Sequence, residues 1–321
     1  MSNDYQFYRD PRKLERSGGN VPLCGDSSLS DKARVRFAKE GRGSGEWGTY
    51  VPGRTFRELR GVGRMHRFSC SRCGGRQIAL PSDMALATFL EEHWDPRTRD
   101  LREYFPLVDV DETVRIARSI GVNHPTYRDG SPRILTTDLL VCKLESDNYS
   151  WTAVHSASAR DCAAGMSSGW LIIREFWRRA GVGSRTTYSL GLNSFRVRNL
   201  WLLFGYGEQL VAYGLNDREQ CAQEAVIRRL RRRNDARISD ACSAAARASD
   251  LTRAECARAV LQLIACHAME CRLDVPILLE QSTGFIRIAD DPRQFVSSFL
   301  ARDSDFSVDV TAGQRAGSIR N

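Results

Sequence analysis

Two stretches of the sequence stand out: Ser82-Asp83-Met84-Ala85-Leu86-Ala87-Thr88-Phe89-Leu90 and Thr137-Asp138-Leu139-Leu140-Val141. The first opens with two residues whose side chains can accept hydrogen bonds from the free amides at a helix start. Apolar residues then recur at helical spacing as far as Trp94, and Asp95-Pro96 is expected to end the helix. The second stretch predicts a strand that carries Asp138 at its buried edge.

The sequence around these stretches alternates between strand and helix patterns. Strands are predicted at 55–59, 66–68, 76–80, 101–108, 136–143, 149–155 and 187–190, and the loop 144–148 joins two of them as a pair. Helices are predicted at 111–120 and 193–203, with another ending over 174–180. This pattern indicates an α/β fold with a mixed sheet.

The second half of the chain has a different character. From 217 to 272 it is almost wholly helical and contains no proline, and Thr252 with Glu255 fits a capping box. A short helix, a turn and a strand over 273–288 resemble a winged-helix element. The length of 321 residues favours two domains. We therefore predict a flexible tail at 1–33, an α/β domain at 34–205, a helical, winged-helix-like domain at 206–302 and a second tail at 303–321.

The charge balance favours a polyanionic partner. Lys and Arg number 47 against 39 Asp and Glu, which gives a net charge of +8, and neutralising phosphates releases counterions. No apolar run approaches the roughly 20 residues of a membrane span, and the polar first residues do not form a signal peptide. We expect a cytoplasmic, nucleoid-associated protein.

The cysteines offer one metal-binding motif. Cys70 and Cys73 form a CxxC pair, but a zinc knuckle needs four ligands and no second pair follows. The alternative is a hairpin tip, in which Gly74-Gly75 supplies the turn. The cysteines of the helical half are interpreted as small buried hydrophobes.

A helix acid, a strand-end aspartate and a polar-x-Lys pair on the next strand form the active site of restriction-endonuclease-like nucleases. The carboxylates bind Mg²⁺, and the metal stabilises the phosphorane and lowers the pKa of the attacking water. The lysine supports the developing charge and positions that water.

The chain resembles the TnsA-type transposition endonucleases, which cut the 5′ ends of certain cut-and-paste transposons. The resemblance runs from about residue 39 to about residue 295, through many short matches in the right order. The matching pieces are 39–45, 63–67, 82–87, 101–107, 121–125, 136–141, Asn193 with 199–202, and 284–286. The resemblance implies a restriction-endonuclease-like first domain with Mg²⁺ as the cofactor of an active enzyme.

Carried over position by position, the resemblance retains one catalytic residue of the family. Asp138 stands at the strand aspartate, whereas the helix glutamate falls on Ala85. The Gln-x-Lys pair falls on Ala153 and His155. Alanine has no oxygen for a metal, and imidazole replaces a permanent positive charge only in part. We therefore expect weak metal binding at Asp138 and an inactive nuclease.

Other acids could form a rearranged site. Glu91, Glu92 and His93 follow Ala85 on the same helix, and Glu103 lies on the next strand. Glu92 is about 10 Å from position 85 along the helix, too far to share one ion with Asp138. The alternative interpretation is that these are solvated acids at a helix end. Asp138 itself then either serves a metal or hydrogen-bonds a nearby turn.

The densest charge run predicts a second kind of site. It comprises Arg228, Arg229, Arg231, Arg232 and Arg233. Such a run is usually a solvated helix face, and DNA phosphate contact is the alternative. Three tryptophans, Trp170, Trp177 and Trp201, fit apolar helix positions and are expected in the core rather than stacked on bases.

Three functions remain open from the sequence. The first is a TnsA-like pseudonuclease that bridges transposon-end DNA, a DDE-type transposase and an AAA+ regulator, the last through residues 217–300. Without 5′ cleavage, only 3′ joining would remain and cointegrates would form. The second is an active Mg²⁺-dependent endonuclease with a rearranged site, and the third is a DNA-binding regulatory protein.

Overall fold

The computed structural model describes residues 29–59, 64–146, 148–157, 165–188, 194–232 and 235–304. The chain divides into two compact units, Met1–Gly191 and Leu192–Asn321. The predicted boundary at 205/206 lies inside a helix of the second unit, so the division falls earlier than expected. Each unit has its own hydrophobic core.

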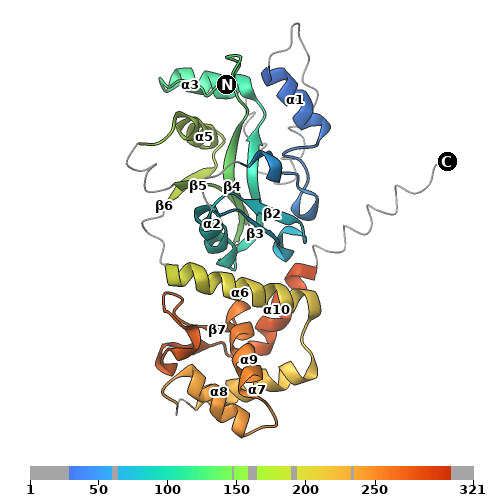
Figure 1. The fold of residues 1–321 in the computed structure, drawn as a ribbon, viewed down its shortest axis with the longest axis vertical. Helices are drawn as coiled ribbons and strands as arrows, with labels where there is room; N and C mark the ends of the chain where they lie inside the picture. Colours follow the sequence, from blue (N-terminus) through green and yellow to red (C-terminus); the bar gives the residue numbers. More distant parts are fainter. Residues whose placement is uncertain are drawn as a thin grey trace, which may run out of the picture. The chain divides into compact units, whose positions relative to one another are not determined.

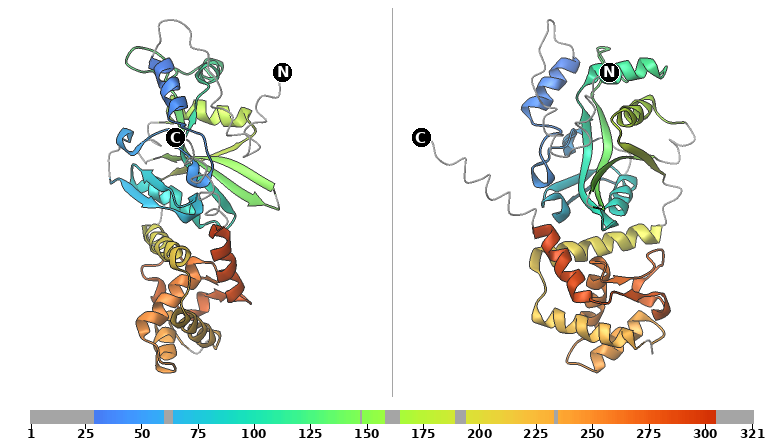
Figure 2. Two further views of the ribbon diagram at one scale, coloured as in Figure 1. Left: turned by 90° about the vertical axis from the view of Figure 1, so that its right-hand side faces the viewer. Right: turned by 180° about the vertical axis from the view of Figure 1, so that it is seen from behind.

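A four-stranded mixed sheet forms the centre of the first unit (Figure 1). Its order is β3(Thr98–Leu107), β4(Leu135–Glu145), β5(Asn148–Ala157), β6(Gly183–Tyr188). The first three strands are antiparallel neighbours, whereas β6 pairs parallel to β5 after a crossover through α5(Ser168–Arg179). Figure 2 shows the same strands from two further sides. The mixed α/β class expected from the sequence is therefore confirmed.

Shorter elements surround this sheet. A hairpin of β1(His66–Ser69) and β2(Gln77–Leu80) precedes α2(Asp83–Trp94), and α3(Val110–Ser119) follows β3. The helix α1(Leu29–Lys39) begins inside the predicted tail, so the tail prediction is wrong for its last five residues. The predicted tail at 1–28 lies outside the described residues.

Two of the three tryptophans lie in the core of the first unit. Trp170 and Trp177 on α5 are 2% and 0% exposed, and they pack with residues of β3, β4, β5 and α3. Burying one aromatic side chain of this size stabilises the fold by about 4–6 kcal/mol in area bookkeeping. The Trp177 indole N–H donates to Thr137 Oγ1 at 2.8 Å, which satisfies its one polar atom. Trp201 differs from its prediction, because it is 40% exposed on the second unit.

The CxxC pair is found at a hairpin tip, as the second interpretation proposed. A single turn, Ser71–Cys73, joins β1 to β2, and Gly74 and Gly75 adopt positive φ angles of 68° and 75°. Both thiols are fully buried. Within the described part of the chain, no group of metal-binding side chains contains both cysteines.

The second unit is a helical bundle with a two-stranded pair. Its helices are α6(Ser194–Tyr213), α7(Asp217–Arg231), α8(Ile238–Arg247), α9(Arg253–Ala265) and α10(Pro292–Ser304). The strands β7(Met269–Glu270) and β8(Arg287–Ile288) pair antiparallel. The predicted capping box at the start of α9 is confirmed, since the Thr252 hydroxyl accepts from the Glu255 N–H and the Glu255 carboxylate accepts from the Thr252 N–H.

The helix α9 lies at the centre of this unit and contacts α6, α7, α8 and β7 (Figure 1). Eight of its residues are buried. In a winged-helix DNA-binding domain, the helix before the wing must present an open face to the major groove. Most of α9 is covered by its neighbours, and the winged-helix assignment stays a prediction.

Four local predictions differ from the structure. The predicted strand at 55–59 is a single helical turn, Phe56–Glu58. The strand predicted at 187–190 is β6, which begins earlier, at Gly183. The helix predicted at 193–203 continues to Tyr213 through two glycines. Cys221 is exposed rather than buried.

Candidate functional site

The paired strands β4 and β5 separate next to Asp138 and His155, the residues around which the candidate site lies. Their ladder ends with the pair Leu139–Val154, although β4 begins four residues earlier, at Leu135, and β5 continues to Ala157. Asp138 and His155 are therefore the first residues beyond the last pair. Backbone groups released at such a divergence need other partners, and here the Ser156 N–H donates to Asp138 Oδ2 at 3.1 Å.

The Asp138 carboxylate also contacts His155. Oδ2 lies 2.5 Å from His155 Nδ1, and the side chains are 34% and 25% exposed, so both reach solvent. The imidazole stacks on the ring of Trp170, with centroids 4.5 Å apart and an interplanar angle of 16°. Packing and hydrogen bonding thus hold the ring, and one carboxylate oxygen serves two protein partners.

The helix α2 brings Ala85 to the same place. The Ser82 hydroxyl caps the helix by accepting from the Ala85 N–H at 3.2 Å. One turn later, the Thr88 and Ser156 hydroxyls lie 3.0 Å apart, which fixes this face of α2 against the end of β5. Residues three apart share a helix face, so Ala85 lies on the side of α2 that faces this site.

Ala153 precedes His155 by two residues on β5 and is fully buried in the apolar core. The structure thus brings Ala85, Asp138 and His155 to one place where two strands diverge, with Ala153 on the neighbouring position of β5. Their family roles stay a prediction.

Sequence reasoning missed a fourth side of the site, formed by Tyr104 and Arg54. Tyr104 lies on β3 between the residues that pair with Leu139 and Thr137, and has a left-handed φ of 51°. Its carbonyl accepts from the Gly53 N–H at 2.8 Å, and a Cβ at position 53 would stand 2.5 Å from that oxygen. Only glycine allows this close approach.

The Tyr104 ring is buried between two charges. Arg54 lies over it, with the guanidinium carbon 5.8 Å from the ring centroid. Burial raises the pKa of the Tyr104 hydroxyl, the Asp138 carboxylate adds to that rise, and Arg54 opposes it. Tyr104 therefore keeps its proton to higher pH than an exposed tyrosine. In the sequence, the Gly53-Arg54 step after Pro52 was the one signal for this side of the site. That Arg54 would lie over Tyr104 was not apparent from the sequence.

The acids proposed for a rearranged site are held elsewhere. Glu92 is 2% exposed and pairs with Lys143 at 3.3 Å and with Arg185. Lys143 is five residues from Asp138 on β4, about 17 Å along a strand. The interpretation of Glu92 as a solvated acid is therefore wrong, because Glu92 is a buried residue held in ion pairs with Lys143 and Arg185.

Glu103 is likewise committed to another contact. It is 1% exposed and pairs with Arg76 at 2.6 Å. Burial raises the pKa of the Glu103 carboxyl, while Arg76 opposes that rise. Glu103 is thus part of a buried ion pair in the core.

The donor set around Asp138 does not fit Mg²⁺. This ion prefers octahedral oxygen coordination that includes carboxylates, and Ala85 and Ala153 offer no side-chain oxygen. In the portion of the chain that the structure describes, no third His, Cys, Asp or Glu ligand atom lies within 4.8 Å of those of Asp138 and His155.

The arginine run lies at the end of α7 and is partly neutralised. Arg229 donates to both oxygens of Asp235, at 2.6 and 2.7 Å. Arg231 donates to the carbonyls of Ala289 and Asp290, at 3.2 and 2.9 Å. Arg228 and Arg232 are exposed, and neither has an ion-pair partner among the described residues. Arg233 lies outside the described residues.

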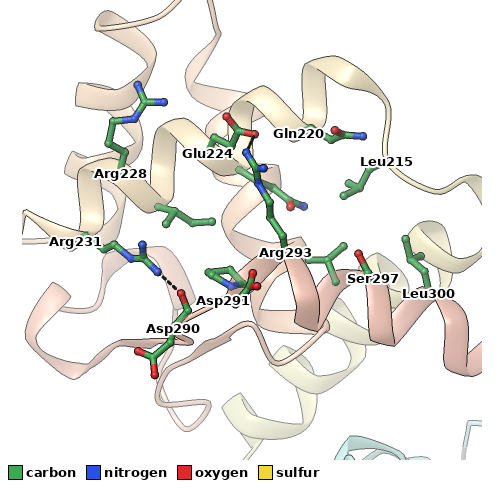
Figure 3. A pocket seen from close by; sticks show the side chains of 14 residues that line it. Leu215, Gln220, Glu224, Arg228, Arg231, Asp290, Asp291, Arg293, Ser297 and Leu300 are labelled. Atoms are coloured by element: carbon green, nitrogen blue, oxygen red, sulfur yellow. Dashed lines mark hydrogen bonds and ion pairs between the residues drawn. The ribbon is translucent and has the colours of Figure 1, made fainter.

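A pocket of about 770 Å³ opens beside this run (Figure 3). Arg228 and Arg231 line it from α7, and Arg293 of α10 crosses it to pair with Glu224. Ile227, Val296 and Leu300 supply its apolar part. Two of the five arginines of the run therefore face a pocket of mixed character rather than a continuous basic surface.

The geometry defines a mixed α/β core with a capped helix and a strand-end aspartate that meet where two strands separate. Over 119 residues the chain is 41% identical to the transposon Tn7 transposition protein TnsA of Escherichia coli. The aligned stretch is 37% of this chain and 42% of TnsA, less than half of either protein. No protein-family model matches the chain. This similarity supports a TnsA-like family for the aligned stretch. Within the described residues, no helix is long and apolar enough to cross a membrane.

Proposed function

We propose that this protein is a TnsA-like subunit of a DNA transposition machine that no longer cuts DNA. The observation that carries the proposal is the Asp138 carboxylate, which accepts the Ser156 N–H and contacts His155 while Ala85 stands on the adjacent helix face. A nuclease aspartate must turn its oxygens to a metal. Here Ser156 and His155 both contact Oδ2 of Asp138. At the position of the family's helix glutamate, Ala85 offers only a methyl group.

The missing groups carry most of the expected chemistry. A metal in such a site stabilises the phosphorane charge and generates the attacking hydroxide. Removing one donor that stabilises developing negative charge commonly costs two to three orders of magnitude in rate, about 3–4 kcal/mol, and the lysine that would fill this role is absent here. His155 is held by stacking on Trp170 and by Asp138, so it is not free to swing toward a phosphate.

The retained fold then serves assembly. By its resemblance to TnsA, the chain would hold transposon-end DNA and contact a DDE-type transposase and an AAA+ regulator, the last through the second unit. With 5′ cleavage absent, the transposase would complete 3′ joining alone. Cointegrate products are the expected consequence, unless another subunit cuts the 5′ strand.

A plasmid-nicking assay tests this proposal. The full chain is incubated with supercoiled plasmid carrying the transposon ends, with Mg²⁺ or Mn²⁺, alone and with the partner transposase. The expected result is the same background nicking for the wild type and for Asp138→Ala. Cleavage by the wild type that Asp138→Ala abolishes would overturn the proposal and favour the active endonuclease.

The two alternatives have less support. An active enzyme with a rearranged site would need Glu92 or Glu103, and both are buried in ion pairs. A purely regulatory DNA-binding protein would need an open recognition helix, and α9 is covered. Absence of transposase and ATPase genes beside this one would count against a role in transposition.

A further inference from the structure

The strongest unassigned feature is a set of exposed arginines in the first unit. Four of them lie on either side of residues 60–63, which are outside the described part of the chain, and none of the four has an acidic partner among the described residues: Arg54, Arg57, Arg64 and Arg67. Unpaired, exposed guanidinium groups at this density create a local positive potential. We refer to these four residues as the 54–67 arginine surface.

The only acid in this stretch of sequence is already neutralised. Glu58 accepts from Arg42 at 2.6 and 3.1 Å and lies 3.3 Å from Arg36. Burial acts to raise the pKa of the Glu58 carboxyl, but Arg42 and Arg36 keep it below its ordinary value. Because these two cations come from outside the set, Glu58 removes no positive charge from the 54–67 arginine surface.

An exposed aromatic ring lies within the same surface. Phe56 is 44% exposed, and the guanidinium carbon of Arg67 lies 5.7 Å from its ring centroid. This contact ties the Phe56–Glu58 turn to β1. An arginine over a ring keeps its N–H edge free, and that edge matches phosphate oxygens in a bidentate manner.

Two contacts place the 54–67 arginine surface at the border of the candidate site. Arg54 lies over Tyr104, the β3 residue beside Asp138. At the other end, His66 of β1 contacts Asp83 in the first turn of α2 at 2.7 Å, two residues before Ala85. The surface therefore borders both halves of the site, the strand and the helix.

Acids at this border are few and are themselves in contact with histidines. Asp83 faces His66, and Asp138 faces His155 at 2.5 Å.

We propose that the 54–67 arginine surface binds the phosphate backbone of duplex DNA beside the site, without a metal ion. This inference takes from the proposed function only that the partner is DNA. It holds whether or not the protein cuts that DNA. It also reassigns the main DNA contact from the arginine run of α7, where Arg229 and Arg231 are already occupied, to the first unit.

The structure offers a matched pair of variants for the test. Arg57 and Arg64 are exposed and have no partner in the described residues, and the same is true of Arg228 and Arg232 on the second unit. Arg57→Gln with Arg64→Gln and Arg228→Gln with Arg232→Gln each remove two charges without breaking an ion pair. Both should fold like the wild type, which circular dichroism and thermal unfolding will verify.

The measurement is the fluorescence anisotropy of a labelled duplex of mixed sequence with the full chain, without divalent ions. Each phosphate contact contributes about 0.9 to the slope of log affinity against log salt. Loss of two contacts should lower that slope by about 1.8, so that the loss of affinity between 50 and 200 mM salt becomes about 12-fold smaller. The Arg228→Gln, Arg232→Gln variant should keep the wild-type slope.

Three outcomes would overturn the proposal: no duplex binding by the wild type, an unchanged slope for Arg57→Gln with Arg64→Gln, or equal weakening in both pairs, which would reflect net charge alone. Tighter binding of single-stranded DNA or of duplex RNA would overturn the assignment to duplex DNA. Failure here leaves the nicking result untouched, so the two proposals fail separately.

Discussion

Removal of the Asp138 side chain should weaken the fold rather than an activity. In Asp138→Ala, the Ser156 N–H loses its charged acceptor and His155 loses its ring partner. A hydrogen bond to a charged group contributes about 1.5–3 kcal/mol. The contact between the two side chains adds little, because both are partly exposed and solvent screens it.

We therefore expect Asp138→Ala to lower the free energy of unfolding of the first unit by about 1.5–3 kcal/mol. For a unit of this size, that corresponds to a fall in Tm of about 3–12 °C. Five of the six tryptophans lie in residues 1–191, so tryptophan fluorescence reports mainly on this unit and separates it from the second.

Asp138→Asn is the control, because the amide oxygen can still accept the Ser156 N–H although the charge is gone. It should lose about half as much stability as Asp138→Ala. An Asp138→Ala protein with wild-type stability would refute the view that the carboxylate serves the fold. Loss of metal-dependent cleavage with unchanged stability would refute it more strongly.

Four further predictions follow from particular contacts. Trp177→Ala should destabilise the first unit by about 3–5 kcal/mol. Trp177→Phe should destabilise it by less, because it keeps an aromatic ring and loses only the indole N–H that donates to Thr137 Oγ1. Urea unfolding measures both. Burial lowers the pKa of His124 below its ordinary value of 6.5, against the hydrogen bond to the Pro125 carbonyl. The folded state then binds fewer protons than the unfolded state, so the contribution of His124 to the free energy of unfolding is present above pH 6.5 and is lost as the pH falls through the lowered pKa. In His124→Gln, the free energy of unfolding should therefore depend less on pH below 6.5. Gly53→Ala should destabilise the first unit because its Cβ would meet the Tyr104 carbonyl at 2.5 Å. Thermal unfolding checks this, with Gly183→Ala as the control, because a Cβ at position 183 would make only an ordinary contact of 3.7 Å with Thr152 Oγ1. Asp235→Asn should release Arg229 and raise duplex affinity by less than the Arg57→Gln, Arg64→Gln pair lowers it, as measured by anisotropy.

The sequence predicted the elements whose signals are local. Ser82 caps α2, and Thr252 with Glu255 caps α9, as expected. The same kind of signal explains one error. Thr55 and Glu58 form a reciprocal capping box around the Phe56–Glu58 turn, and this short-range bonding outweighs the strand propensity of Phe56.

Errors of longer range came from partners that the sequence does not reveal. The helix was predicted to end at residue 203, but α6 continues through Gly205 and Gly207 to Tyr213, and a Cβ at Gly207 would meet the Phe299 ring at 3.4 Å. The glycine is there for close helix packing rather than for a turn. Likewise the arginine run looked unopposed until Asp235, after the end of α7, was seen to hold Arg229.

The candidate site was predicted in part. Family resemblance placed Ala85, Asp138, Ala153 and His155 together, but no pattern in either strand shows that the β4–β5 ladder ends at Leu139–Val154. The divergence depends on tertiary contacts of Tyr104 and of α2. For the same reason, the contact between Asp138 and His155 and the border formed by Arg54 could not be foreseen.

The central claim is that a nuclease-like site has kept its framework and lost its chemistry. Restoring the family residues tests it most directly, with Ala85→Glu, Ala153→Gln and His155→Lys combined in one protein and assayed for Mg²⁺-dependent plasmid nicking beside the wild type. The account predicts no nicking by the wild type, nicking by the restored protein, and its loss when Asp138→Ala is added. Nicking by the unaltered protein that depends on Asp138 would contradict the account.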